Sequence, residues 1–261
     1  MGRIYAGIDV GASSTDVVLL NDEKRIIAYS VLSTGPIHQQ TSDCALQEAC
    51  RAASCTIDDL VCILGTGYGR KNIRGAANPV TEIACHAKGA RYYFADVRTI
   101  VDIGGQDSKV IKVDERGNVI DFAMNEKCAA GTGRFLEAMA RTLQVDLDRM
   151  GELSFSAKTN VRLSSVCTVF AESEVISKIA EGQRVEDLLK GIHNSICDRT
   201  MAMLERIKVE PAVAMTGGVA KNQGIVSLLQ ARLHCTVHVP EEPQIVGALG
   251  AALFAREKAG A

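Results

Sequence analysis

The stretch Val101-Asp-Ile-Gly-Gly-Gln-Asp107 places an aspartate near the end of an apolar run and a glycine-rich turn directly after it. The apolar run predicts a buried strand at Thr99–Ile103, and Ser108–Val113 predicts the next strand. Successive backbone N–H groups in such a turn form a concave anion site, and Mg²⁺ binds one or two carboxylates together with phosphate oxygens. One such turn by itself is usually an ordinary hairpin.

The same pattern occurs near the N-terminus. Ile8-Asp9-Val10-Gly11 matches Val101-Asp102-Ile103-Gly104 at an offset of 93 residues, and at this offset Ile26-Ile27 matches Val119-Ile120. A repeat of this length predicts two similar domains and not the short unit of a solenoid. Two such turns, each with an aspartate, indicate a nucleotide held between two domains.

The repeat predicts an α/β fold in which each domain is a mixed sheet with helices on its faces. We expect the first domain at residues 1–97 and 240–261, and the second at residues 98–239. A third glycine turn, Thr216-Gly-Gly-Val219, follows an apolar strand at Ala212–Met215. The chain has no Gly-x-x-x-x-Gly-Lys loop, and its strand-to-strand turns differ from the strand-to-helix turn of the dinucleotide fingerprint.

Two cysteines lie in stretches of similar composition, Cys128 within Asn125–Phe135 and Cys167 within Ser164–Glu174. Both stretches pass from a polar turn into a periodic apolar segment, so each cysteine is expected at the start of a helix. The free N–H groups and partial positive charge of a helix start lower a cysteine pKa, which favours the thiolate that binds metal or attacks a substrate. The alternative is two buried thiols that pack as small hydrophobic side chains.

The composition excludes several classes of protein. The 261 residues are 47% hydrophobic, which supports a sizeable core in one large domain or two modest ones. The net charge of −2 leaves no electrostatic footprint for nucleic acid. No apolar run predicts a membrane span and no signal-peptide pattern is present, so a cytoplasmic location is expected. The nine cysteines are odd in number and include no Cys-x-x-Cys pair, which argues against a disulfide framework or a zinc ribbon.

These features resemble the acetate and sugar kinase/Hsc70/actin superfamily, whose members share a duplicated actin-like ATPase fold. The closer resemblance is to the ATP-dependent activators of 2-hydroxyacyl-CoA dehydratases and to the related benzoyl-CoA reductase ATPase subunits of the BadF/BadG/BcrA/BcrD type. The cysteine segments are the specific part, because general superfamily members lack them. The matching stretches span nearly the whole chain: Gly7–Gly11, Thr66–Arg70, Glu82–His86, Val101–Asp107, Asn125–Phe135, Cys167–Ile176 and Thr216–Val219.

The resemblance implies a homodimer that holds one [4Fe-4S] cluster through Cys128 and Cys167 of each subunit. A cubane cluster takes four thiolates, and two cysteines per chain supply four across a twofold axis. In the family, ATP binding and hydrolysis are thought to reorient the helices that carry the cysteines. A low-potential electron then passes to the iron–sulfur centre of a partner acyl-CoA dehydratase or reductase. The implied upstream donor is a ferredoxin or flavodoxin, and the implied cofactors are the cluster, ATP/ADP and Mg²⁺.

The resemblance also implies roles for individual residues. Asp9 and Asp102 would address Mg²⁺, directly or through water. Gln106 would complete this catalytic set by orienting the attacking water. It would not act as the base, because an amide is a poor base. The residues that would hold phosphates are Ala12, Ser13, Ser14, Gly104, Gly105 and Gln106. The residues that would border adenosine and ribose are Gly131, Gly133, Gly217, Gly218 and Asn222.

Other functions are compatible with parts of the sequence. A small-molecule kinase of the same superfamily would need a catalytic carboxylate at the second turn, which Asp107 supplies, but it would leave Cys128 and Cys167 without a purpose. A non-catalytic actin-like interaction protein is disfavoured by the same cysteines, whereas relatives that reduce double-cubane cluster proteins share the cysteine segments. Lys109 is either a counter-charge for phosphate or a solvated strand lysine, and the pair Cys85-His86 is expected to pack.

Overall fold

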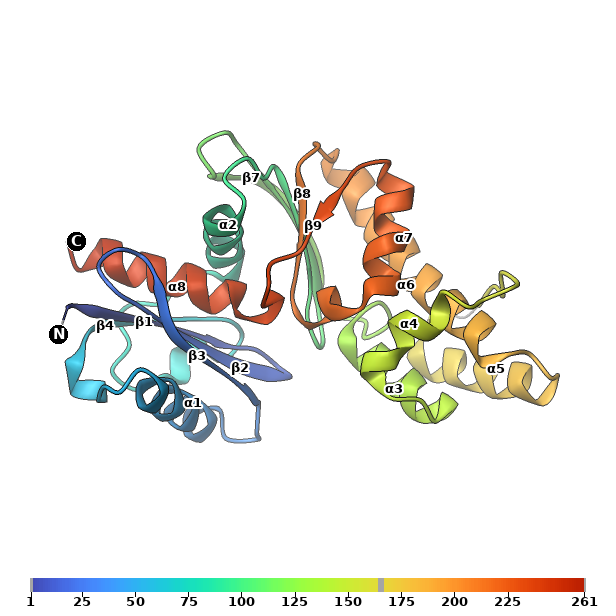
Figure 1. The fold of residues 1–261 in the computed structure, drawn as a ribbon, viewed down its shortest axis with the longest axis horizontal. Coiled ribbons are helices and arrows are strands. Elements are labelled where there is room, and N and C mark those ends of the chain that lie inside the picture. The colour runs from blue at the N-terminus through green and yellow to red at the C-terminus, as the bar shows by residue number, and fades with distance from the viewer. Residues whose placement is uncertain (1, 164–166, 261) are drawn as a thin grey trace. The chain divides into compact units, whose positions relative to one another are not determined.

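The computed structural model describes residues 2–163 and 167–260, so residues 164–166 of the second cysteine stretch lie outside it. The chain forms two compact units. The first comprises Met1–Val97, Val113–Ile120 and Pro240–Ala261, and the second comprises Arg98–Lys112 and Asp121–Val239. Figure 1 shows the elements of each unit.

The first unit contains a four-stranded mixed sheet. Its strands are β1 (Ile4–Val10), β2 (Ser14–Leu20), β3 (Ile26–Ser33) and β4 (Leu60–Thr66), in the order β3-β2-β1-β4. Strand β1 pairs antiparallel with β2 and parallel with β4. Every residue of β1 is buried, which explains its continuous apolar sequence apart from the aspartate near its end.

Two helices cover opposite faces of this sheet. Helix α1 (His38–Ala52) packs against one set of alternating side chains of β1 and β2, and helix α8 (Val246–Lys258) packs against the other set. Helix α2 (Glu82–Tyr93) packs against α8 (Figure 1). Three short 3₁₀ turns complete the unit, at Ile57–Asp59, Arg70–Asn72 and Pro243–Ile245.

Glycines allow α8 to approach its neighbours closely. A Cβ atom added to Gly7 of β1 would collide with the carbonyl oxygen of Ala248, and one added to Gly250 would collide with that of Cys85. Helix α8 therefore lies against β1 and α2 at a spacing that only glycine permits at these positions. The small residues of its N-terminal half, expected from the sequence to allow close packing, do so.

The second unit contains a five-stranded sheet built on the same plan. Its strands are β5 (Thr99–Ile103), β6 (Ser108–Val113), β7 (Val119–Asn125), β8 (Val213–Thr216) and β9 (Val237–His238), in the order β7-β6-β5-β8-β9. Strand β5 pairs antiparallel with β6 and parallel with β8, as β1 does with β2 and β4. The predicted duplicated α/β fold is thereby confirmed.

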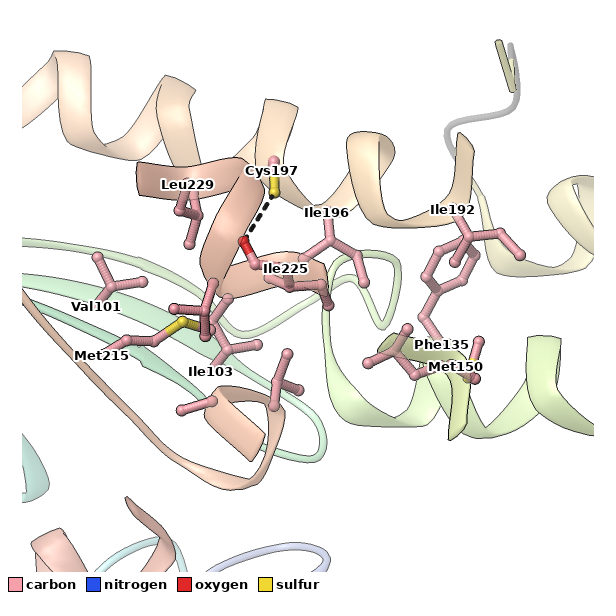
Figure 2. Packing of buried hydrophobic residues seen from close by; sticks show 14 of the residues in the cluster. Val101, Ile103, Phe135, Met150, Ile192, Ile196, Cys197, Met215, Ile225 and Leu229 are labelled. Carbon is pink, nitrogen blue, oxygen red and sulfur yellow. Dashed lines mark hydrogen bonds between the residues drawn. The ribbon is translucent and has the colours of Figure 1, made fainter. Parts of the chain in front are cut away.

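The helices of the second unit build its core. They are α3 (Gly133–Leu143), α4 (Met150–Ser154), α5 (Thr168–Ala180), α6 (Val185–Ile207) and α7 (Gln223–Leu233), with 3₁₀ turns at Leu147–Arg149 and Gly218–Lys221. Side chains of β5 and β8 meet those of α3, α4, α6 and α7 in one cluster, shown in Figure 2. The Cys197 thiol lies in this cluster and donates to the Ile225 carbonyl oxygen at 3.8 Å. A strand expected at Val161–Leu163 does not form, because these residues pass α6 as irregular chain.

Candidate functional site

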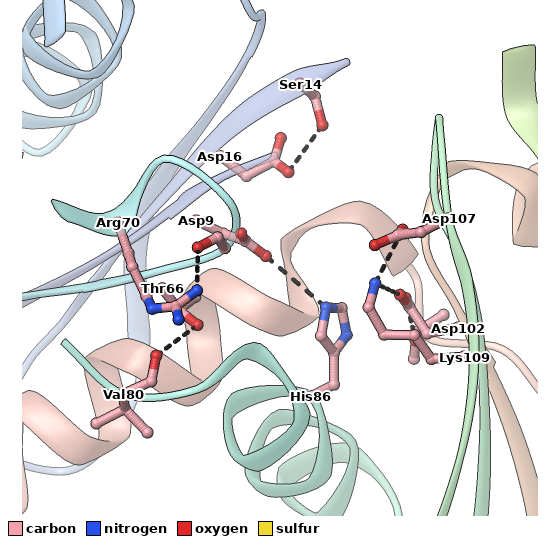
Figure 3. A network of polar contacts seen from close by, with 12 residues as sticks. Asp9, Ser14, Asp16, Thr66, Arg70, Val80, His86, Asp102, Asp107 and Lys109 are labelled. Atoms are coloured by element: carbon pink, nitrogen blue, oxygen red, sulfur yellow. Dashed lines mark hydrogen bonds and ion pairs between the residues drawn. The ribbon is translucent and has the colours of Figure 1, made fainter. Parts of the chain in front are cut away.

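The first glycine turn lies at the end of β1, where two buried aspartates occupy paired positions on neighbouring strands. Asp9 on β1 and Asp16 on β2 are cross-strand partners. The Ser14 hydroxyl donates to Asp16 Oδ2 at 3.0 Å, and His86 Nε2 lies 3.8 Å from Asp9 Oδ2 (Figure 3). The sequence predicted only packing for His86 and missed its approach to Asp9, because α2 lies far from β1 in the chain.

Two glycines enclose the carboxylate of Asp9. A Cβ atom added to Gly67 would collide with Asp9 Oδ1, and one added to Gly247 would collide with Asp9 Oδ2. Gly67 also has a φ of 82°, a conformation that favours glycine. The carboxylate therefore lies in a cradle of backbone from β4 and α8, which fixes its direction.

The turn between β1 and β2 holds the residues predicted to bind phosphate in this unit, Ala12, Ser13 and Ser14. The Gly11 N–H donates to the Ser14 carbonyl oxygen at 2.9 Å and closes the turn. The Ser13 Oγ atom is buried, and no hydrogen-bond partner for it occurs in the part of the chain that the structure describes. A buried hydroxyl without a partner costs free energy, and an anion bound in this turn would satisfy it.

The second glycine turn closes in the same way and is also attached to a helix. The Gly104 N–H donates to the Asp107 carbonyl oxygen at 3.0 Å. The Gly104 carbonyl oxygen accepts from Gly133 N–H at 2.8 Å, and the Gly105 carbonyl oxygen accepts from Arg134 N–H at 2.9 Å. These two donors belong to the first residues of α3, whose N–H groups have no partner inside the helix. The turn thus caps α3, so a displacement of the turn is transmitted to this helix.

A buried lysine lies beside the carboxylates of the second turn. Lys109 Nζ is 3.2 Å from Asp102 Oδ2 and 2.9 Å from Asp107 Oδ1 (Figure 3). The Thr216 hydroxyl donates to the other oxygen of Asp102 at 2.8 Å. Because Lys109 is only 3% exposed, the reading of it as a solvated strand lysine is wrong. The sequence also gave no role to Thr216, although it precedes the third glycine turn.

The three residues predicted at the third turn, Gly217, Gly218 and Asn222, have different structural roles. Gly217 has a φ of 81° and lies against the Ile103 carbonyl, and Gly218 begins the 3₁₀ turn. Asn222 caps α7, because its Oδ1 accepts from Ile225 N–H at 3.2 Å. Its Nδ2 lies 3.1 Å from His193 Nε2. The amide of Asn222 is therefore held by its own unit from both ends.

The contact with Asn222 fixes the protonation of His193. The amide Nδ2 is only a donor, so His193 Nε2 must accept and the ring is neutral. Burial lowers the pKa of His193 to about 4, since the charged ring cannot be hydrated there. His193 lies on α6 and is completely buried against the start of α7.

Acid is expected to destabilise the protein through His193. The unfolded ring binds its proton near pH 6.5 and the folded ring near pH 4, so stability is complete above pH 6.5 and falls as the pH drops toward 4. The free energy of unfolding should fall by about 3 kcal/mol over this pH range. Urea unfolding at pH 4.5 and 7.5 measures it; His193→Gln should flatten this pH dependence, and the exposed His234→Asn should not. An unchanged pH dependence in His193→Gln contradicts the assignment.

The structure places the two predicted cluster cysteines in different local settings. Cys167 is exposed and is the residue immediately before α5, as expected. Cys128 is half-buried in the loop before α3, which begins at Gly133. The expectation that Cys128 starts a helix is therefore wrong, because the turn at Ala129–Thr132 intervenes. In this loop Gly131 has a φ of 96° and packs against the Arg199 side chain.

Helix α5 exposes apolar side chains beside Cys167. Its buried residues are Ala171 and Val175, whereas Val169 and Phe170 are 67% and 70% exposed. Ile176 and Ile179 are also exposed, so most of the apolar side chains that follow Cys167 face outward. Helix α5 is tied to α3 by the Thr142 hydroxyl, which donates to Glu172 at 2.9 Å. The two helices that follow the cysteines are thus in direct contact.

Other cysteines have a different chemical character. Cys50, Cys85 and Cys197 are buried, and burial raises the pKa of each thiol to about 12. Such thiols stay protonated and pack as small hydrophobic groups. Within residues 2–163 and 167–260, no group of three or more His, Cys, Asp or Glu side chains could hold a metal ion, and no helix there is long and apolar enough to span a membrane.

Known proteins that resemble this chain include activators of acyl-CoA dehydratases. The chain is 46% identical over 253 residues to the activator of lactoyl-CoA dehydratase of Anaerotignum propionicum, covering 97% of both chains. Its fold matches the Clostridium difficile activator of the 2-hydroxyisocaproyl-CoA dehydratase with bound ADPNP (TM-score 0.94, 40% identity, 99% and 96% covered). It also matches component A of the Acidaminococcus fermentans (R)-2-hydroxyglutaryl-CoA dehydratase (TM-score 0.95, 40% identity, 100% of both chains).

The family assignment follows from a match that covers almost the entire chain. The model of one ATPase family matches residues 6–255, which include all three glycine turns and both cysteine segments. The relatives are similar over their full lengths and not only at these motifs. The chain belongs to the BadF/BadG/BcrA/BcrD ATPase family.

Proposed function

We propose that this protein is an ATP-driven one-electron donor that activates an iron–sulfur acyl-CoA dehydratase. Its relatives are named activators of acyl-CoA dehydratases, which supports the activating role. One observation carries the proposal. The second phosphate turn is hydrogen-bonded through Gly104 and Gly105 to the first residues of α3, and the loop before α3 contains Cys128. A change at the nucleotide phosphate would thus move the segment that bears a cluster ligand.

The nucleotide roles remain those that the sequence suggests. Asp9 and Asp102 address Mg²⁺, directly or through water, and Gln106 orients the attacking water. The turns bind phosphate through Ala12, Ser13 and Ser14 in the first unit and through Gly104, Gly105 and Gln106 in the second. The buried Ser13 hydroxyl supports this role. Adenosine and ribose are bordered by Gly131, Gly133, Gly217, Gly218 and Asn222, of which Gly133 also supports α3 through its N–H.

The residues around Cys128 and Cys167 fit a [4Fe-4S] cluster. Cys167 is exposed and Cys128 is half-buried, in contrast to the buried thiols of Cys50, Cys85 and Cys197. The first N–H groups of α5 follow Cys167 directly, and no side chain among the residues that the structure describes caps them, so they can donate to an anionic group. Such a cluster, when bound, supplies one-electron transfer at low potential.

We further propose that two copies of the chain hold the cluster jointly. Each copy contributes Cys128 and Cys167, and four thiolates complete the ligand set. The exposed Val169 and Phe170 beside Cys167 would be buried against the second copy, which is the expected behaviour of an apolar patch of this kind. A cytoplasmic location and a ferredoxin or flavodoxin as the electron source belong to the same proposal.

Anaerobic purification followed by three measurements tests the proposed function. We expect about four iron atoms per pair of chains, the mass of a dimer in ultracentrifugation, and ATP-dependent reduction of a purified dehydratase component with dithionite as the initial reductant. A colourless protein that phosphorylates a small metabolite would contradict the proposal and favour a kinase. In that case Asp107 would have to act as a base, although it is paired with Lys109. The same assay, with a benzoyl-CoA reductase component or a double-cubane protein in place of the dehydratase as electron acceptor, distinguishes these alternative partners.

A further inference from the structure

The internal repeat places residues of opposite charge at one equivalent position. In the first unit the partner of Asp9 across β1 and β2 is Asp16. In the second unit the partner of Asp102 across β5 and β6 is Lys109. The same offset of 93 residues relates Asp9 to Asp102 and Asp16 to Lys109. The two turns have the same backbone plan but differ in charge at the point where each strand ends.

The first turn has the composition of a cation site. Asp9 and Asp16 occupy paired positions on β1 and β2 and are 8% and 5% exposed, and buried carboxylates favour a cation nearby. Their neighbours include the Ser14 hydroxyl, which donates to Asp16, and the His86 ring at 3.8 Å from Asp9. Mg²⁺ prefers one or two carboxylates together with phosphate oxygens, so this turn suits a metal that arrives with a nucleotide.

The second turn already contains a cation. The Lys109 ammonium group lies within hydrogen-bonding distance of both Asp102 and Asp107, and Thr216 donates to the remaining oxygen of Asp102. Burying an ammonium group is costly unless carboxylates surround it. These two carboxylates offset that cost. The ammonium group occupies the position from which a metal ion would contact the same two carboxylates, so a direct metal ligand at Asp102 requires that Lys109 first leave.

We propose that Lys109 is an internal cation that takes the place of a metal at the second turn, so that Mg²⁺ is bound directly only at the first turn. Lys109 is then a positioning residue that holds Asp102 and Asp107, and through them the backbone of Gly104 and its hydrogen bond to α3. The inference rests on the proposed nucleotide-binding function. It narrows that proposal, because Asp102 would act on Mg²⁺ through water and not as a direct ligand.

Mn²⁺ binding to the nucleotide-free protein, followed by electron paramagnetic resonance, tests the inference. Lys109→Gln removes the charge and leaves two unmatched carboxylates, so it should gain one Mn²⁺ site with an affinity at least about tenfold above that of the wild-type protein. Lys109→Arg retains the charge and should bind Mn²⁺ as weakly as the wild type. Adding Asp102→Asn to Lys109→Gln should remove the gained site. Equal Mn²⁺ binding by the wild type and a folded Lys109→Gln overturns the inference.

A second measurement does not depend on the folding of Lys109→Gln. In the complex with ADP, Asp9→Asn should weaken Mn²⁺ binding at least about tenfold, whereas Asp102→Asn should weaken it less than about threefold. An equal loss in both variants makes Asp102 a direct ligand and overturns the inference. If the wild-type protein binds no ADP, the proposed function fails, and the nucleotide-free experiment still decides whether Lys109 blocks a metal.

Discussion

Serine at position 128 or 167 is expected to remove the iron–sulfur cluster from the protein. A twofold arrangement loses two of its four thiolates with each substitution, and a serine oxygen is a poor substitute for the soft sulfur ligand. Iron should fall from about four atoms per pair of chains to less than about a tenth of that, and ATP-dependent electron transfer should be lost. Iron and sulfide analysis of anaerobically purified Cys128→Ser and Cys167→Ser measures this loss.

The control for this experiment is Cys44→Ser, because Cys44 is also exposed but lies on α1 in the other unit. It should retain the iron content of the wild-type protein. Cys167→Ser should keep the wild-type circular dichroism spectrum, since an exposed serine before α5 is a good helix cap. Full iron content in both cluster variants would rule out the ligand assignment.

The second large effect is expected at Gly67, where a single methyl group should disable the first turn. Alanine at position 67 would place its Cβ against Asp9 Oδ1 and the Val10 carbonyl, and the carboxylate would have to move. A displacement of about 1 Å in a catalytic group lowers a rate by about a hundredfold. The rate of ATP hydrolysis in Gly67→Ala should therefore fall by about that factor, measured by phosphate release.

Gly75→Ala is a matched control for Gly67→Ala. Gly75 has a φ of 72°, close to the 82° of Gly67, but a Cβ atom added there has no neighbour within 4 Å. Both variants therefore carry the same backbone strain of about 1 kcal/mol, and only one of them displaces Asp9. Gly75→Ala should hydrolyse ATP within about twofold of the wild-type rate, because its strain lies in an exposed loop. Equal loss in both variants would assign the effect to backbone strain and not to Asp9.

The sequence predicted the fold well because its strongest signal is a repeat. Two apolar strands that each end with an aspartate and a glycine turn specify two mixed sheets, and this signal needs no knowledge of tertiary contacts. The predicted strand at Val161–Leu163 and the predicted helix start at Cys128 were wrong for a local reason. Both lie in irregular segments that pack against α6. Gly131 in the loop before α3 contacts the Arg199 side chain of α6, and Gly191 of α6 contacts the Val161 carbonyl.

The site was predicted in part. The repeat indicated the first two glycine turns, and the assignment of Cys128 and Cys167 as cluster ligands stays a prediction. The partners of the charged residues could not be predicted from the sequence. Lys109 can be buried because Asp102 and Asp107 both pair with its ammonium group, and Thr216 of β8 donates to Asp102. His86 reaches Asp9 only because α2 packs beside α8. The alignment of Asp16 with Lys109 was present in the repeat and is the signal that could have indicated the difference between the two turns.

The place of α8 in the first unit constrains how the protein is made. The ribosome releases residues 4–66, which form the first sheet, long before residues 246–258, which cover one of its faces. At a synthesis rate of about 5–20 residues per second, the apolar side chains of Val18 and Leu20 stay exposed for roughly ten seconds or more before α8 is available to cover them. The second unit, whose segments all precede residue 240, is synthesised first in full. Nascent chains of this protein therefore present an open sheet to chaperones until residues 246–258 have left the ribosome.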